Sequence, residues 1–340
     1  MMASRLIEPL GLLHGADARA ACAAGLALPL AGGPAAFSLC RLTGNGDGRI
    51  QPVSALGQGW APVLARVTTA PPASGLPPGV LVMGILNATP DSFSDGGRFG
   101  DTQMAIATAL AMVDAGAALI DVGGESTRPG AVPVAPDIEQ ERILPIVRAL
   151  AVRGVRVSVD TRHASTMQAA LETGAALIND VSALSHDPQA RQVVAAARCP
   201  VVLMHMRGTP LSMAGLTDYD DVAVDVVQAL EARLAEAEAA GIDRARVIVD
   251  PGIGFAKTEA QSLELLRRLP ILANLGCRVL LGVSRKGFIG RIAGVSDPLG
   301  RLPGSIAACL PGLLLPGTIL RVHDVAETVQ AVRLWQAIGG

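Results

Sequence analysis

From residue 80 onward, short apolar runs alternate with longer amphipathic stretches, and this alternation limits the folds open to the chain. Short apolar runs bounded by polar or glycine-rich residues are typical of strands buried on both faces of a parallel sheet. Eight such runs predict strands: Val80–Leu86, Ala118–Val122, Arg156–Val159, Leu177–Asn179, Val201–Met204, Arg246–Val249, Arg278–Val283 and Thr318–Val322.

The segments between these runs have helical character. The clearest predicted helices are Gln103–Ala115, Pro136–Arg153, Tyr219–Ala240 and Glu259–Leu272. Eight strand–helix units over roughly 260 residues match a closed barrel better than an open sheet. We therefore predict an α/β protein built as a TIM (β/α)8 barrel with an N-terminal extension. The alternative is a doubly wound open sheet.

Residues 1–76 differ in composition from the rest. The stretch Thr68–Gly79 is rich in proline and glycine, as linkers are, whereas Ala18–Leu30 is apolar enough to pack against another surface. The run Asn45–Gly48 predicts a turn, because the acidic ligands of an EF-hand calcium loop are missing. We predict that residues 1–76 form an extension and linker, to which the sequence assigns no role, and that residues 77–340 form the barrel.

The charge balance argues against nucleic acid and membrane partners. The 28 Lys and Arg residues nearly match the 30 Asp and Glu residues, and they are scattered along the chain. The most apolar stretch, around Leu310–Leu320, is interrupted by two prolines and is shorter than the ~20 residues of a membrane span. Five distant cysteines and an N-terminus without the pattern of a secretory signal lead us to expect a soluble, cytoplasmic protein with reduced thiols.

Polar or glycine-rich residues follow every predicted strand. In a barrel these strand ends meet at one mouth, where active sites lie. A single Asp after a strand is usually a helix N-cap, so Asp160 or Asp250 alone indicates little. Together with Asn179 and Lys286, they place two carboxylates, an amide and an ammonium around one cavity. This set suits a flat heterocycle with several N–H donors and acceptors, which a carboxylate binds strongly once water is excluded.

A second set of strand-end residues is cationic or donates hydrogen bonds. It consists of Arg128, Arg321 and His323, together with Asn87. Taken singly, Arg128 would be a surface ion pair and His323 a core or cap histidine. Because the last strand of a closed barrel lies beside the first, these groups can meet. Their natural ligand is an anion such as phosphate or diphosphate.

Two nucleotide-binding motifs fail on inspection. The run Gly252–Thr258 resembles part of a phosphate-binding P-loop, but Ala256 stands where that motif needs glycine and the first glycine is misplaced. No G-x-G-x-x-G opens a helix after the first strand, which disfavours a dinucleotide site.

Taken in order, the strand-end runs resemble dihydropteroate synthase, and the resemblance covers residues 80–338. Each run alone is weak, whereas eight in the same order are highly specific. The runs are Met83–Gly97, Asp121–Gly130, Val159–Thr161, Ile178–Val181, Met204–Pro210, Asp250–Phe255, Ser284–Lys286 and Arg321–Val325.

The resemblance implies a reaction: condensation of 6-hydroxymethyl-7,8-dihydropterin diphosphate with p-aminobenzoate, giving 7,8-dihydropteroate and diphosphate. It also implies a homodimer, Mg²⁺ as cofactor and a role for each matching residue. The implied pterin-binding residues are Asp160, Asn179, Met204, Asp250, Phe255 and Lys286. The implied diphosphate-binding residues are Asn87, Arg128, Arg321 and His323, and Asn87 would also hold Mg²⁺. The implied p-aminobenzoate pocket consists of Phe93, Thr127, Pro129 and Ser284. Asp91 and Asp95 lie on a loop that the family orders over the site, and Asp160, Lys286, Arg321 and His323 are the implied catalytic residues.

The implied chemistry agrees with the residue types. Diphosphate leaves readily once Mg²⁺ and cationic side chains absorb its charge. The pterin methylene that remains is a stabilised cation, so an SN1-like path follows, with no need for a Ser-His-Asp or Cys-His nucleophile. Two alternatives stay open: a pterin-dependent corrinoid methyltransferase, which has no need of the cationic set, and a catalytically silent pterin-binding relative.

One local departure concerns the last crossover. Pro311 and Pro316 predict that the helix before the final strand is shortened or kinked, because proline lacks the N–H that a helix interior needs. The Arg321 run is intact, so we expect the final strand to form normally.

Overall fold

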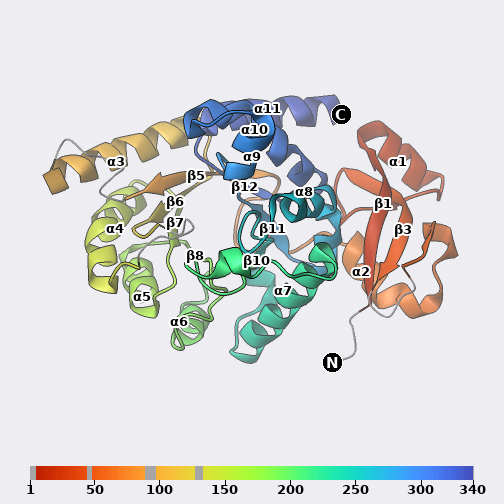
Figure 1. Cartoon of the computed structure of the whole chain (residues 1–340), viewed down its shortest axis with the longest axis horizontal. Coiled ribbons are helices and arrows are strands. Elements are labelled where there is room, and N and C mark those ends of the chain that lie inside the picture. The colour runs from red at the N-terminus through yellow and green to blue at the C-terminus, as the bar shows by residue number, and fades with distance from the viewer. Residues whose placement is uncertain (1–4, 44–47, 89–96, 127–132, 340) are drawn as a thin grey trace.

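A closed barrel of parallel strands forms most of the chain in the computed structural model, which describes residues 5–43, 48–88, 97–126 and 133–339, and the backbone only of 97–100. The barrel order is β10-β11-β12-β5-β6-β7-β8-β9, so that the first barrel strand, β5, lies between β6 and the last strand, β12. Helices surround this barrel, and a separate small sheet lies beside it (Figure 1). The predicted TIM barrel is confirmed, and the open-sheet alternative is excluded.

The barrel strands begin and end within a few residues of the predicted bounds. They are β5 (Leu81–Asn87), β6 (Leu119–Gly123), β7 (Val157–Asp160), β8 (Leu177–Asp180), β9 (Val201–Met204), β10 (Val247–Asp250), β11 (Arg278–Leu281) and β12 (Ile319–Val322).

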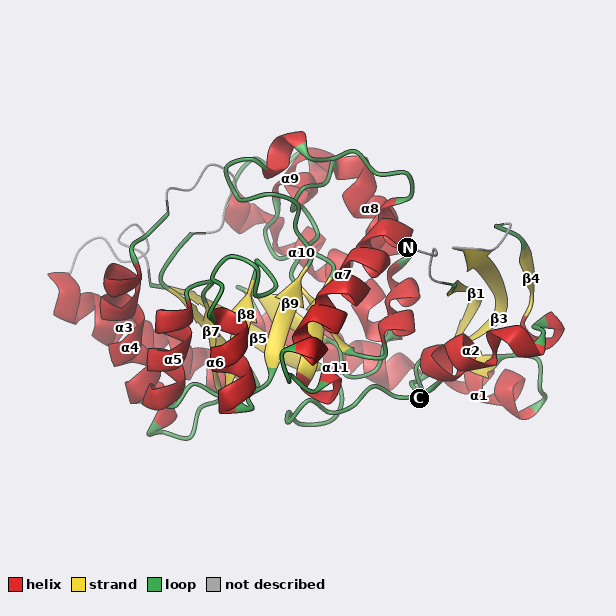
Figure 2. Ribbon diagram, turned by 90° about the horizontal axis from the view of Figure 1, so that it is seen from below, coloured by secondary structure: helices red, strands yellow, loops and turns green. Residues whose placement is uncertain are grey.

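The helices that follow these strands form the outer layer (Figure 2). They are α3 (Gly97–Asp114), α4 (Pro136–Ala151), α5 (Ala164–Thr173), α6 (Ala190–Ala197), α7 (Val222–Ala239), α8 (Glu259–Arg267), α9 (Gly287–Ala293), α10 (Leu302–Cys309) and α11 (Val325–Gly339). Short 3-10 turns are η4 (Met213–Gly215), η5 (Arg244–Arg246), η6 (Leu269–Leu275), η7 (Pro298–Arg301) and η8 (Leu310–Leu314). Among the described helices, none has the length and hydropathy needed to cross a membrane.

Prolines decide where two of these helices end. The predicted helix Glu259–Leu272 is wrong beyond Arg267: Pro270 lies in the first turn of η6, where the chain continues as a 3-10 helix. Proline cannot donate the hydrogen bond that an α-helix would need there. The predicted shortening before the last strand is confirmed, since α10 ends at Cys309 and Pro311 lies in the first turn of η8. Strand β12 forms normally after it.

Side chains alternate along each barrel strand, and this alternation sets the layers of the interior. A buried cluster inside the barrel contains Leu81, Met83, Leu119, Leu177, Val202, Ile248, Leu280 and Ile319. Residues two positions further along a strand point to the same side and lie nearer the mouth. This rule places Asp121, Asn179, Met204, Asp250 and Arg321 directly above the apolar layer.

The opposite end of the barrel is closed by the Pro/Gly-rich stretch. Leu76 is buried and joins the apolar layer of the barrel interior. Arg278, at the start of β11, is 2% exposed and donates to the carbonyls of Ala73, Pro77, Gly79 and Gly317 at 2.7–3.0 Å. Burial lowers the pKa of this guanidinium. Backbone dipoles rather than a carboxylate therefore solvate the buried cation and fix residues 73–79.

The N-terminal residues form a small antiparallel sheet with two helices. Strand β3 (Ala35–Thr43) pairs with β1 (Leu6–His14) on one side and with β2 (Leu28–Pro29) and β4 (Ile50–Pro52) on the other. Helix α1 (Gly15–Ala23) follows β1, and α2 (Ala61–Thr68) follows the turns η1 (Val53–Ala55) and η2 (Gln58–Trp60). The predicted packing of Ala18–Leu30 is confirmed, since Ala18, Ala27 and Leu30 are buried. The predicted turn at 45–47 lies outside the described residues.

Replacing Arg278 with Met should destabilise the chain strongly. The variant leaves the carbonyls of Ala73, Pro77 and Gly79 without their donor at a partly buried site, which costs about 2–4 kcal/mol of unfolding free energy. Urea unfolding followed by circular dichroism measures this, with the exposed Arg267→Met as the control, for which we expect a change below about 0.5 kcal/mol. Equal stability of the two variants would contradict the assigned role of Arg278.

Candidate active site

The guanidinium of Arg321 joins two acidic side chains across the barrel mouth. Its Nε donates to Asp121 Oδ2 at 2.6 Å and its Nη2 to Asp160 Oδ2 at 2.8 Å. Arg321 lies on β12, Asp121 on β6 and Asp160 on β7, so the arginine reaches past β5. Barrel closure alone brings these three residues together, because β12 would be remote from β6 in an open sheet.

Asn179 completes this group from β8. Its Nδ2 donates to Asp121 Oδ2 at 3.1 Å, and the side chain is 4% exposed. Burial raises the pKa of Asp160; Arg321 opposes this effect and Asp121 adds to it. Two carboxylates thus share one cation in a place with little water. A ligand that donates N–H groups to Asp160 would satisfy a carboxylate that the protein has already desolvated.

Asp250 and Lys286 form a second polar pair on the other side of the mouth. Asp250 Oδ1 accepts from Gly252 N at 2.7 Å, and burial raises the pKa of this carboxyl group while Lys286 opposes the rise. Lys286 Nζ donates to Ile253 O and lies 4.4 Å from the ring centroid of Phe255. Burial lowers the pKa of Lys286 to about 8. A carbonyl, an aromatic face and a distant carboxylate therefore hold the ammonium.

The loops after β9 and β10 pack tightly against each other beside this pair. Lys257 Nζ lies 3.0 Å from His205 Nδ1 and donates to Gly252 O at 2.9 Å and Phe255 O at 3.0 Å. Gly252 has a φ of +63°, and a Cβ there would lie 2.0 Å from His205 O. Only glycine permits this approach. Lys257, the lysine of the rejected P-loop match, thus fixes the loop that carries Phe255.

Ser284 and His323 lie together near the ends of β11 and β12. Ser284 Oγ is 2.9 Å from His323 Nδ1 and accepts from His323 N at 3.2 Å. Next to them, Arg285 forms an ion pair with Asp324. The residues predicted for p-aminobenzoate and for diphosphate are therefore in direct contact at Ser284 and His323.

The remaining predicted residues fall into two groups. Asn87 is half-buried at the end of β5, Met204 is buried at the end of β9 and Phe255 is half-buried after β10. Asp91, Phe93, Asp95, Thr127, Arg128 and Pro129 lie outside the described residues, so the meeting of Arg128 with Arg321 and His323 stays a prediction.

Two residues of the site were missed from the sequence. Asp121 is fully buried and touches both Arg321 and Asn179. Its signal is a charged residue inside an apolar strand, two positions after the inward-facing Leu119. Lys257 gave no such signal, because its partners are backbone carbonyls and a histidine on a different loop.

A cavity of about 460 Å³ opens on the β6–β9 side of the mouth. Its lining includes the ion pair of Arg162 with Glu125, in which Nη2 and Oε1 are 2.8 Å apart, and the side chains of His163, His186 and Met206. The predicted pterin residues Asp160, Asn179, Asp250 and Lys286 are not among the lining residues. We therefore do not place the pterin in this cavity.

Comparison with known proteins agrees with this geometry. A family model described as pterin binding enzyme matches residues 83–323. A dihydropteroate synthase of Synechocystis sp. is 44% identical over 258 residues, which are 76% of this chain and 89% of the relative. The chain belongs to the dihydropteroate synthase family of pterin-binding enzymes. The residues before position 83 lie outside the family model.

Solved structures of the dihydropteroate synthase family share the barrel. The Xanthomonas albilineans dihydropteroate synthase with 4-aminobenzoic acid is 45% identical, with a TM-score of 0.72 over 78% of this chain and 94% of that chain. The Yersinia pestis dihydropteroate synthase in a sulfonamide drug complex is 41% identical, with a TM-score of 0.72 over 76% of this chain and 94% of that chain.

The lowered pKa of Lys286 predicts how ligand binding at this site depends on pH. The ammonium is present below the pKa of about 8 and is lost as pH rises through it. If Lys286 binds the pterin as the sequence predicts, affinity for a pterin ligand should fall above pH 8, rather than near the usual lysine pKa of about 10.4. Fluorescence titration with a pterin from pH 6.5 to 10 measures this fall.

The matched control is Lys286→Arg, because a guanidinium stays charged throughout this range. Its affinity should lack the fall near pH 8 once the ionisation of the free pterin is corrected for. The same fall in both proteins would mean that another group is titrating.

Proposed function

We propose that the chain is a dihydropteroate synthase, which joins 6-hydroxymethyl-7,8-dihydropterin diphosphate to p-aminobenzoate. The observation that carries this proposal is the convergence of Asp160, Asn179, Asp250, Lys286 and Arg321 at one barrel mouth. Membership of the dihydropteroate synthase family supports it.

The pterin binds between the two polar groups of the mouth. Asp250 accepts hydrogen bonds from the amino-pyrimidine edge, and Lys286 donates to a ring carbonyl or ring nitrogen. Asp160 and Asn179 bind the remaining ring polar groups from β7 and β8, and Met204 and Phe255 contact the ring. The burial of both carboxylates supports this assignment, because a desolvated carboxylate gains most from N–H donors that replace water.

The diphosphate binds on the side of β12 and β5. Arg321 and His323 lie on or after β12, and Asn87 ends β5 next to it. When diphosphate arrives, Arg321 divides its donors between the phosphate oxygens and the aspartates that now hold it. We propose that Arg128 also binds the diphosphate.

Mg²⁺ fits this place only together with the substrate. The described residues contain no group of three or more His, Cys, Asp or Glu that could hold a metal ion, while Asn87 offers a single amide oxygen. Mg²⁺ is commonly held by one or two protein oxygens plus substrate phosphates, so one asparagine suits it. In this role Mg²⁺ would neutralise charge on the leaving diphosphate.

The reaction follows an SN1-like path. The bond from the pterin methylene carbon to the diphosphate oxygen breaks, and diphosphate leaves with the electron pair. Positive charge spreads over the methylene and the ring, near the carboxylate of Asp160. The amino nitrogen of p-aminobenzoate then attacks the methylene and loses a proton to solvent or diphosphate. In this proposal Phe93, Thr127, Pro129 and Ser284 hold p-aminobenzoate.

The test of this function is product formation. The full chain, incubated with Mg²⁺ and both substrates, should form 7,8-dihydropteroate and diphosphate in equal amounts, and EDTA should abolish the reaction. Pterin binding without turnover would instead indicate a silent relative. Methyl transfer from a reduced methylated pterin to a corrinoid would indicate the methyltransferase.

Single substitutions should distinguish the residues that bind the pterin ring from those that bind the diphosphate. Lys286→Ala and Asp250→Asn should each weaken binding of a pterin that lacks the diphosphate by about ten- to a hundredfold, the cost of a lost charge-assisted hydrogen bond. Arg321→Ala should weaken the diphosphate substrate more than the bare pterin. Calorimetric titration of each variant with both ligands measures this, and wild-type affinity in all three variants would refute the assignment.

Sulfonamides should inhibit by competing with p-aminobenzoate. They present a similar aryl amine with an anionic group, and the Yersinia pestis relative is known in a sulfonamide drug complex. Steady-state inhibition with each substrate varied in turn measures this. If inhibition were relieved by the pterin substrate rather than by p-aminobenzoate, the proposed division of the pocket would be wrong.

We further propose that the protein acts as a cytoplasmic homodimer. Helices α9, α10 and α11 lie side by side (Figure 1). Around them are the exposed apolar side chains Ile292 on α9, Leu299 on η7 and Leu334 on α11. Burying such side chains against a second copy would remove apolar surface from water. Light scattering after size-exclusion chromatography gives the mass of the assembly.

A further inference from the structure

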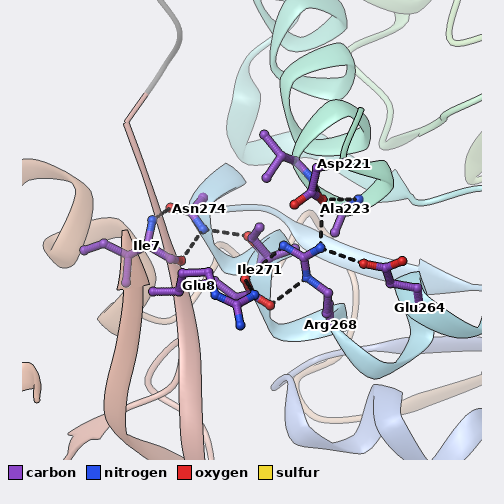
Figure 3. Close-up of polar contacts among 10 residues, drawn as sticks. Ile7, Glu8, Asp221, Ala223, Glu264, Arg268, Ile271 and Asn274 are labelled. Carbon is purple, nitrogen blue, oxygen red and sulfur yellow. Dashed lines mark hydrogen bonds and ion pairs between the residues drawn. The ribbon is translucent and has the colours of Figure 1, made fainter. Parts of the chain in front are cut away.

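The N-terminal sheet contacts the barrel at η6, the short 3-10 helix between α8 and β11. Asn274 in η6 is 2% exposed. Its side-chain amide pairs with the backbone of β1 as a neighbouring strand would. Its Oδ1 accepts from Ile7 N at 3.0 Å, and its Nδ2 donates to Ile7 O at 2.8 Å (Figure 3). This contact fixes β1 relative to the barrel. It places the next residue, Glu8, against the end of α8.

Glu8 forms a buried ion pair there. It is 2% exposed, and its two oxygens accept from Arg268 Nε at 2.7 Å and Nη2 at 2.9 Å. Arg41, which lies opposite on β3, donates to Glu8 Oε2 at 3.0 Å. Arg268 is itself 5% exposed. The pair is bidentate, desolvated and satisfied, which is the arrangement in which loss of one partner is most costly.

Arg268 also contacts the residue at the start of α7 (Figure 3). Its Nη1 donates to Asp221 Oδ1 at 2.8 Å and to Glu264 Oε1 at 2.9 Å. Asp221 is the N-cap of α7, and the same oxygen accepts from Ala223 N at 3.0 Å and Val224 N at 3.1 Å. One guanidinium thus links the added sheet, the end of α8 and the beginning of α7.

The loops that lead into α7 and α8 line the side of the barrel mouth at which we propose that the pterin binds. Tyr219, two residues before Asp221, donates to Ala256 O at 2.9 Å, and Gln261 in α8 donates to Thr217 O at 2.8 Å. Ala256 follows Phe255 directly. A series of contacts and short chain segments therefore runs from Glu8 through Arg268, Asp221 and the Tyr219 loop to Ala256, the residue next to Phe255.

We propose that Glu8 is a positioning residue for the pterin substrate, acting through Arg268 on the loops 205–221 and 251–258. Without Glu8, the buried guanidinium keeps only Asp221 and Glu264, whose side chains are 39% and 42% exposed. It would turn toward them or toward water and shift the N-cap of α7. Since the loop that follows β10 holds Phe255, the affinity for the pterin ring would fall. This inference rests on the proposed function.

The test is Glu8→Gln in the full chain, assayed well below the melting temperature of each variant. The KM for the pterin diphosphate should rise about three- to tenfold, the range expected for an indirect contact, while kcat and the KM for p-aminobenzoate change less than about twofold. Amide hydrogen exchange should quicken in residues 205–221 and 251–258.

His14→Ala is the matched control. His14 attaches the same sheet to α11, with its ring centroid 5.4 Å from that of Trp335, and it does not touch Arg268. It should lower the melting temperature without changing the KM for the pterin diphosphate. If both variants raise this KM alike, the sheet merely stabilises the fold and the inference is overturned.

A double-mutant cycle with Arg268→Met tests whether Glu8 acts through Arg268. Glu8→Gln should have no further effect on the KM in that background, whereas additive effects would overturn the inference. Unchanged KM and unchanged exchange in Glu8→Gln would also overturn it. A wild-type chain that forms no dihydropteroate would refute the proposed function instead, and the exchange measurement would still decide whether Glu8 orders the two loops.

Discussion

The ion pairs of Arg321 with Asp121 and Asp160 depend on every larger feature of the barrel. They need closure, because β12 must lie beside β5 for the side chain to reach β6 and β7. They need the alternation of side chains, which lifts Asp121 above the apolar layer that contains Leu119. They also need the burial of the Asp121 and Asp160 carboxylates, since exposed pairs of this kind contribute little. The guanidinium balances two carboxylates that the protein could not otherwise bury together, and this balance keeps Asp160 available to a ligand.

Much of the barrel could be predicted from the sequence, because its signals are local. Apolar runs, the polar residues at their ends and the prolines around α10 each determine the structure of their own short segment. The predicted strands were confirmed for this reason. The end of α8 was misjudged because one proline, Pro270, outweighed the amphipathic pattern around it. Asp160, Asn179 and Asp250 could be placed at the mouth because each lies within the last two residues of a strand, and Lys286 because it lies in the short loop after β11.

What could not be predicted depends on contacts between distant positions. Ile7 and Asn274 are 267 positions apart, and no pattern around Ile7 announces that an amide will pair with its backbone. The same is true of Arg278 and the carbonyl of Ala73. Arg321 was correctly placed at the mouth, but its partner Asp121 was missed, since a lone acidic residue within a strand is ambiguous until the register is known.

The contact between Ile7 and Asn274 also bears on how the chain avoids association through its added sheet. Strand β1 is an edge strand, and edges with free N–H and C=O groups invite pairing with other chains. Asn274 occupies the backbone groups of Ile7; Pro9, two residues on along the same edge, has no N–H; and Gly11 bends the strand with a φ of +58°. The free edge of β1 therefore offers no continuous run of donors and acceptors, so this edge presents no template for pairing with another chain.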